Sequence, residues 1–129
     1  MRRLGAFIGR ALMSGIFIGA GLSTVRDPGE RRTQQVADIG LPNPEALVRL
    51  NGAAMLAGGV AMAAGIVPRA AATGLALLLI PTTYAGHRFW REDDPATKAQ
   101  QRTHFLKNLA IVGGLIGYVA LSGRAATTD

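Results

Sequence analysis

The chain has 129 residues, of which 49% are hydrophobic and only 17% are charged, and its formal net charge is +6. This length suits one domain, and the charged share lies below the roughly 25% usual for soluble domains. The chain has no cysteine, which excludes disulfides, thiolate metal sites and cysteine nucleophiles. Because the basic residues flank apolar segments, the positive charge favours anionic lipid headgroups over nucleic acid as a partner.

Four apolar segments predict an all-α protein, a polytopic membrane protein that folds as a four-transmembrane-helix bundle. Each segment is near the ~20 residues that cross ~30 Å of hydrocarbon, and together they form a single domain over residues 1–129. Pro81 lies in the third segment, which is the shortest, and predicts a bend there. The hydroxyls of Thr82, Thr83 and Tyr84 are expected to satisfy the carbonyl that this proline leaves free. The expected helices span about 4–25, 46–67, 70–86 and 95–122.

Glycines recur at four-residue spacing in these segments. Such pairs of small residues let the backbones of membrane helices approach closely, so that van der Waals contact holds the helices together. The spacing predicts close crossings between helices of this chain, and it leaves contacts between copies of the chain open. The pairs are Gly5 with Gly9, Gly15 with Gly19, and Gly113 with Gly117, and a further set combines Ala54 with Gly58 and Gly59.

Two longer connections, roughly residues 26–45 and 87–104, are expected on the same side of the membrane. The first is polar and rich in turn-forming residues. In the second, Asp94 followed by Pro95 predicts the start of the last helix, with an N-cap acceptor and a proline at the first helical position. More basic residues lie near these connections than on the opposite side with the termini, which favours a cytoplasmic location for the connections. The Met-Arg-Arg start favours the reverse orientation, with the N-terminus inside, and the orientation stays open.

Seven polar side chains are candidates for binding a quinone or a lipid headgroup. Arg10 lies about two turns inside the first helix, where it binds an anionic or carbonyl group or serves as an interfacial anchor. The other six lie at helix ends on the side of the long connections. Their alternative role is a hydrogen-bond network that ties these helix ends together. The candidates are Arg10, Arg49, Asn51, His87, His104, Lys107 and Asn108.

The charged stretch from Arg91 to Arg102 is expected to dock a partner protein. No complete catalytic set accompanies it, and the two histidines lack the H-x-x-H and H-E-x-x-H spacings of metal sites. We therefore predict no catalytic residues, no metal and no resident cofactor, with quinone as the alternative. The expected docking residues are Arg91, Glu92, Asp93, Asp94, Lys98 and Arg102.

Several separated motifs resemble the DoxX family in its actinobacterial form. They are RLNGAAMLAGGVAMAAGIVPRAAATGLALLLIPTTYAGHRFW, the DDP that follows it, and HFLKNLAIVGGL. The resemblance runs from about Gly9 to Gly123, with the motifs in the same order and spacing. The chain departs from the family at Met55, where many members carry glutamate or glutamine just before the double glycine. This departure weakens an enzymatic interpretation.

The resemblance implies a multi-pass protein of the inner, or plasma, membrane. Members of this family are linked to subunits of terminal quinol oxidase and of thiosulfate:quinone oxidoreductase. We accordingly expect a non-catalytic accessory or scaffold subunit of a larger redox or cell-envelope complex, and a quinone-interacting oxidoreductase subunit is the alternative. The expected partners are membrane lipids and other membrane-protein subunits, including respiratory or redox proteins. A homo-oligomer stays open.

Overall fold

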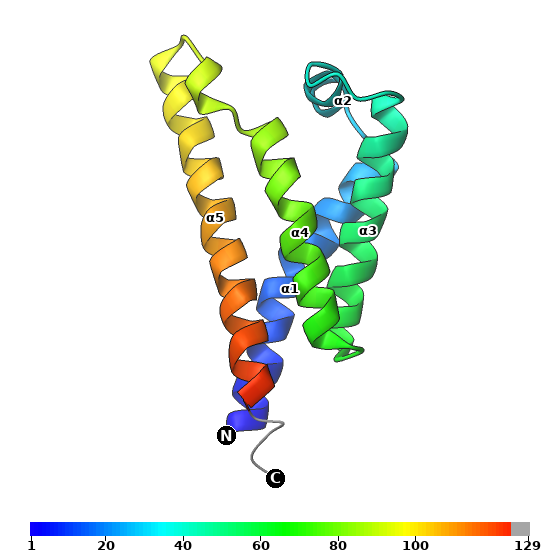
Figure 1. Ribbon diagram of the computed structural model, residues 1–129, viewed down its shortest axis with the longest axis vertical. Coiled ribbons are helices and arrows are strands. Elements are labelled where there is room, and N and C mark those ends of the chain that lie inside the picture. Colours follow the sequence, from blue (N-terminus) through cyan, green and yellow to red (C-terminus); the bar gives the residue numbers. More distant parts are fainter. Residues whose placement is uncertain (125–129) are drawn as a thin grey trace.

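The computed structural model describes residues 1–124, and all the regular structure in this part of the chain is helical (Figure 1). The all-α prediction is therefore confirmed. The start of α1 and the end of α5 lie at one end of the bundle, which we call the terminal end. Helix α2 and the 3₁₀ helix η1 lie at the other, the loop-side end. The elements are α1 (Arg2–Arg26), α2 (Glu30–Ala37), α3 (Pro44–Ala64), α4 (Pro68–Gly86), η1 (Phe89–Arg91) and α5 (Pro95–Arg124).

Three helices are long and apolar enough to cross a membrane, namely α1, α3 and α5. Helix α4 has 19 residues and lies between α3 and α5, but it is not among the three. Its mean hydropathy is lowered chiefly by Arg69 near its start, and further by Pro81, Thr82 and Thr83 in its C-terminal part. The interpretation of α4 as a fourth crossing therefore stays a prediction.

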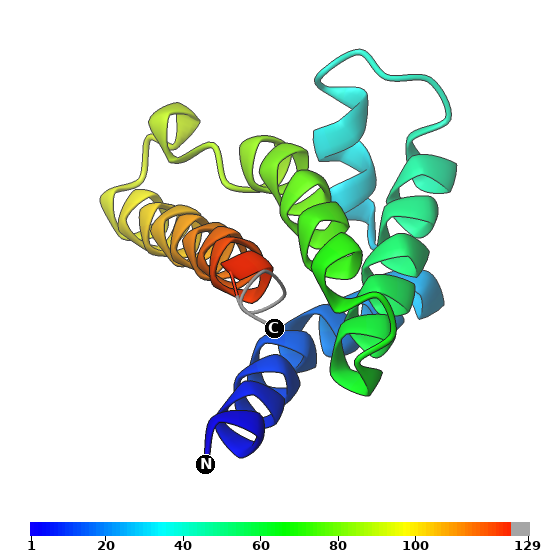
Figure 2. The same ribbon diagram turned by 60° about the horizontal axis from the view of Figure 1, so that its bottom comes forward.

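The core lies where the four long helices meet. One fully buried large side chain comes from each of them: Phe17 from α1, Met62 from α3, Leu75 from α4 and Leu115 from α5. Helix α1 packs mainly on α3, α3 on α4, and α4 on α5, with α1 crossing behind the others (Figures 1 and 2). This order places α4 between two neighbours along its length.

The crossing of α1 and α3 depends on glycines that leave no room for a side chain. A Cβ at Gly21 would lie 2.6 Å from the Leu56 nitrogen and 2.7 Å from the Gly52 oxygen. A Cβ at Gly52 would lie 2.8 Å from the Cβ of Thr24, and one at Gly59 would lie 3.0 Å from Ile18. These glycines let the two backbones touch, as close helix packing in membranes requires.

The glycine prediction is right for one set and wrong for the other pairs. Gly58 packs against Leu75 of α4, as a predicted close contact between helices. The remaining pairs meet nothing within 4 Å of an added Cβ, because they lie on faces of α1 and α5 that the other helices of this chain do not cover. These pairs are Gly5 with Gly9, Gly15 with Gly19, and Gly113 with Gly117.

Helix α2 was not expected, since its segment reads as polar turns. The Gly29 backbone has φ 71°, which favours glycine and turns the chain after Asp27, whose carboxylate accepts from the Gly29 nitrogen at 3.0 Å. The side-chain amide of Gln35 then donates to the Gly86 carbonyl at 3.1 Å. This bond holds α2 against the end of α4.

Helix α4 continues through Pro81, and the prediction for its threonines is wrong in one respect. The hydroxyl of Thr82 donates to the Leu78 carbonyl at 2.8 Å, and that of Thr83 donates to the Leu79 carbonyl at 2.7 Å. Proline frees the carbonyl four residues earlier, which belongs to Leu77. Each hydroxyl donates to the carbonyl four residues before its own position. The two threonines therefore bind the carbonyls of Leu78 and Leu79 and leave that of Leu77 unbound by them.

Candidate functional site at the loop-side end

Two asparagine–threonine bonds tie α4 to both of its neighbours. Asn51 of α3 donates to the Thr82 hydroxyl oxygen at 3.0 Å, and Asn108 of α5 donates to the Thr83 hydroxyl oxygen at 3.0 Å. Asn108 and Thr83 are buried, whereas the bond of Asn51 is partly buried. Two of the predicted site residues therefore use their side-chain amides to join helices, which is the role of the alternative hydrogen-bond network.

The two histidines stack on each other where α4 ends and α5 begins. Their ring centroids are 5.2 Å apart and their planes are 21° apart. His87, the C-cap of α4, donates from Nδ1 to the Gln101 side-chain oxygen at 2.8 Å, since an amide oxygen only accepts. Lys107 lies beside them, with its ammonium 3.4 Å from Nδ1 of His104.

Gln101 is a residue of this cluster that sequence reasoning missed. It is buried to 5% exposure although glutamine usually lies at the surface. The signal in the sequence was its position three residues before His104, which places both side chains on one face of α5. Together with Lys107 and Asn108, they form the polar part of the α4–α5 contact at this end.

The pKa of His87 is lowered from its ordinary value of 6.5, chiefly because burial disfavours the charged ring. The positive charges of His104, Lys107 and Arg31 lower the pKa further, and the bond to Gln101 opposes the shift. His87 is therefore neutral at pH 7. It lies just after the last residue of α4, outside the three helices that are long and apolar enough to cross a membrane.

Acidification is expected to destabilise the protein through His87. Below pH 6.5 the unfolded chain binds a proton at this residue more readily than the folded chain, so the free energy of unfolding falls as pH decreases. Thermal unfolding in detergent between pH 7.5 and 5.5 should show a Tm lower by a few degrees at the acidic end. The His87→Gln variant should lose part of this slope, and an unchanged slope in that variant would refute the assignment.

Arg49 serves the joint between α1 and α3. Its Nη1 donates to the Val25 carbonyl at 2.7 Å, near the end of α1, and Nη2 lies 3.1 Å from the Glu45 carboxylate. The last carbonyls of a helix lack intrahelical partners and carry partial negative charge, so an arginine there is stabilising. The observed contacts of Arg49 are thus those of a helix cap.

Arg10 lies at the terminal end, far from the other six candidates. Its guanidinium lies beside Gly65, in the turn between α3 and α4. The structure therefore gathers His87, His104, Lys107 and Asn108 into one cluster. It places Asn51 on the other side of α4, Arg49 at the α1–α3 joint, and Arg10 at the opposite end.

The expected docking stretch lies on the outside of the loop-side end. Arg91, Asp93, Lys98 and Arg102 are exposed, and Glu92 is partly exposed. Asp94 is also exposed, but its carboxylate accepts from the nitrogen of Thr97 at 2.8 Å and from its hydroxyl at 2.7 Å. These bonds lower the pKa of Asp94 and make it the N-cap of α5, which begins at Pro95 as predicted.

Aromatic side chains fix η1 on α5 beside this stretch. Phe89, Trp90 and Phe105 contact one another edge to face, with centroids 5.2 to 5.9 Å apart, and Tyr84 of α4 lies 5.8 Å from Trp90. Such pairs prefer tilted geometry and stabilise a fold beyond their buried area. This aromatic packing holds η1 against α5, so the charged stretch is attached to the bundle at this point.

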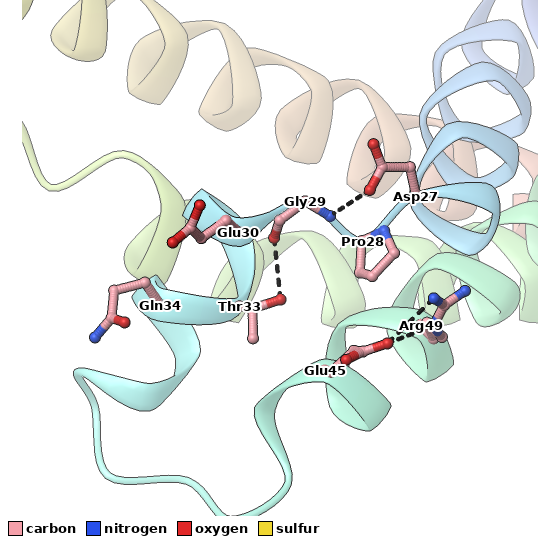
Figure 3. A pocket seen from close by; sticks show the side chains of 8 residues that line it. All are labelled: Asp27, Pro28, Gly29, Glu30, Thr33, Gln34, Glu45 and Arg49. Carbon is pink, nitrogen blue, oxygen red and sulfur yellow. Dashed lines mark hydrogen bonds and ion pairs between the residues drawn. The ribbon is translucent and has the colours of Figure 1, made fainter.

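Two shallow clefts open at the loop-side end. The first, of about 370 Å³, lies between α2, α3 and the segment that joins α1 to α2, and Figure 3 shows the Glu45–Arg49 pair on its wall. The second, of about 360 Å³, lies between α2, the end of α4 and the segment that follows α4. Neither is lined by the histidines or by Asn108. The first is lined by Asp27, Pro28, Gly29, Glu30, Thr33, Gln34, Glu45 and Arg49, and the second by Arg31, Gln34, Gln35, Asp38, Ala85, Gly86, Arg88, Arg91 and Glu92.

The comparisons with known proteins point to one family. A family model described as DoxX matches residues 5–88, which cover nearly all of α1 and the chain as far as the two residues after α4. No curated protein and no solved structure was found to match the chain.

Proposed function

Because the chain belongs to the DoxX family and is a membrane protein, we propose that it is a small accessory or scaffold subunit of a larger complex in the inner, or plasma, membrane. In this proposal it spans the membrane four times, is non-catalytic, and displays the stretch from Arg91 to Arg102 to a partner. The partner is another membrane-associated subunit of a redox or cell-envelope complex.

One observation carries this proposal: the chemically capable side chains at the loop-side end bind one another. Asn51 and Asn108 hold α4, His87 binds Gln101, and Arg49 caps α1. Side chains engaged in this way stiffen the bundle, which is what a scaffold needs. The charged residues beyond them face outward on the first turns of α5, where a partner can reach them.

Lys98 and Arg102 are the best residues with which to test the docking surface. They lie one turn apart on α5, so they share a face, and both are exposed. We expect the Lys98→Glu, Arg102→Glu double variant to retain about tenfold less partner on purification in mild detergent, because charge reversal at an interface both removes attraction and adds repulsion. The matched control is Arg32→Glu, an exposed arginine on α2.

A photo-crosslinker makes the same test in intact membranes. The chain has no cysteine, so Lys98→Cys offers one attachment point and Arg32→Cys a control. We expect a discrete heterologous product from position 98 and much less from position 32. A protein that purifies alone in every mild detergent and gives no product from either position would contradict the scaffold role.

The quinone alternative keeps one supporting observation, the stacked histidine pair beside Lys107. The neutral ring of His87 stacks on His104, and the ammonium of Lys107 lies beside His104. Together they offer a hydrogen-bond partner and a positive charge to a quinone carbonyl oxygen. In that case purified protein would retain quinone, and His104→Ala would release it. Quinone-free protein that still binds its partner would support the scaffold role instead.

A further inference from the structure

The terminal end of the bundle holds a second polar feature, centred on Arg10 of α1. Its Nη2 lies 3.6 Å from the place of a Cβ at Gly65, so the guanidinium lies beside the turn between α3 and α4. Its Nε is buried and, among the residues that the structure describes, has no hydrogen-bond partner. Because Nε is enclosed by protein and Arg10 as a whole is partly exposed, the two Nη groups are the donors that an outside oxygen ligand can reach.

Ser14 repeats this feature one turn deeper on the same face of α1. Its side chain is 0% exposed, and within the described part of the chain its hydroxyl has no partner. The hydroxyls of Thr24, Thr82 and Thr83 all donate to the carbonyl four residues earlier, which is the usual arrangement in membrane helices. Ser14 does not, although a buried polar group without a partner costs about 1–3 kcal/mol.

The distribution of charge favours an anion at this end. All acidic residues from Met1 to Arg124 lie between Asp27 and Glu45 or between Glu92 and Asp94, which are both loop-side segments. Within the described residues, Arg10 accordingly makes no ion pair. Arg69 of α4 lies at the same end, against Gly123 of α5. The local field around Arg10 is therefore positive.

The depth of Arg10 matches the headgroup region of a bilayer. At 1.5 Å per residue, its Cα lies roughly 24 Å along α1 from Arg26, at the loop-side boundary. A hydrocarbon core of ~30 Å then leaves about 6 Å to the opposite boundary. Arginine side chains span that distance by reaching toward the surface, so the guanidinium lies at the level where lipid phosphates begin.

We propose that Arg10 forms a binding site for the phosphate headgroup of an anionic glycerolipid at the terminal end. The guanidinium donates two parallel hydrogen bonds to phosphate oxygens, the geometry for which arginine is suited. Ser14 is enclosed by protein and lies about 12 Å inside the hydrocarbon boundary at this end by the same arithmetic, so its hydroxyl does not contact the lipid. This site does not depend on the scaffold role, which concerns the opposite end.

The test titrates phosphatidylglycerol or phosphatidylcholine into delipidated, full-length protein in a neutral detergent and follows Tm. We expect phosphatidylglycerol to raise Tm and phosphatidylcholine to raise it far less. Arg10→Gln should weaken the apparent affinity for phosphatidylglycerol at least about tenfold, whereas Ser14→Ala, at an enclosed position of the same helix face, should change it by less than about twofold. Arg10→Lys keeps the charge but lacks the fork, so a partial loss is expected even if Arg10→Gln folds poorly.

The matched control is Arg3→Gln, which removes the same charge from an exposed position on the same helix. It should change the affinity by less than about twofold. Equal losses in Arg3→Gln and Arg10→Gln would overturn the site, since they would indicate general attraction to negative lipid. Protection by millimolar inorganic phosphate as strong as that by the lipid, and lost in Arg10→Gln, would overturn the lipid assignment in favour of a soluble anion.

Discussion

Replacing Gly21 by leucine is expected to break the contact between α1 and α3. The new side chain would have to occupy space held by the Leu56 nitrogen and the Gly52 oxygen, which are backbone atoms and cannot rotate away. Overpacking of this kind costs about 1–3 kcal/mol, and more where backbones must separate. We expect Gly21→Leu to show a Tm many degrees below the wild-type value, or no cooperative unfolding in detergent.

The control for this prediction is Gly19→Leu, two residues earlier on α1. Nothing lies within 4 Å of a Cβ at Gly19, and the residue is exposed. In a lipid or detergent environment, leucine at such a place is tolerated, so near wild-type unfolding is expected. If the two variants unfold at the same temperature, the crossing of α1 and α3 described above is incorrect.

Removing the Asn108–Thr83 bond should loosen α5 from α4. A double-mutant cycle with Asn108→Leu and Thr83→Val isolates the pair, because each change keeps the size of the side chain close to the original. Hydrogen bonds between membrane helices contribute about 0.6 kcal/mol on average and up to about 1.7. We expect the upper part of this range, since Asn108 and Thr83 are both buried.

The Asn51–Thr82 pair provides the comparison for that cycle. It has the same chemistry and the same 3.0 Å length, but it joins α4 to α3 and is only partly buried. A cycle with Asn51→Leu and Thr82→Val should give a smaller coupling energy. Additive effects at the Asn108–Thr83 pair would mean that this bond does not hold the helices together.

The long helices could be predicted from the sequence because lipid selects for runs of apolar residues of a set length. The start of α5 at Asp94 and Pro95 could also be predicted, because an N-cap and a first-turn proline depend only on neighbouring residues. Helix α2 and η1 could not be predicted this way. Their stability depends on contacts distant in sequence, such as the bond from Gln35 to Gly86.

The packing of the glycines shows where the sequence pattern stops being informative. The four-residue spacing of Gly15 and Gly19 is that of a packed pair, yet both lie open. Gly21 has no small partner four residues away, yet of the glycines in α1 it is the one whose added Cβ would meet α3, 2.6 Å from the Leu56 nitrogen. The spacing identifies a face that permits close approach, but the crossing of the two helices decides which face is used.

The location of the candidate site could be predicted from the sequence, but the hydrogen-bond partners within it could not. Helix ends place His87 and His104 at one level, and the structure stacks them. The partners Gln101 and Thr83 depend on the register of antiparallel α4 and α5, which no local pattern specifies. That register also explains why the polar residues bind one another.

Labelling of single cysteines tests the central claim, that α4 crosses the membrane. The chain has no cysteine of its own, so Ile66→Cys in the α3–α4 turn and Lys98→Cys on α5 each give one target. Ile66 is 61% exposed, and Lys98 is exposed. With a membrane-impermeant maleimide, we expect position 98 to react only from the cytoplasmic side and position 66 only from the opposite side. Labelling of both positions from the same side would contradict the four-crossing account.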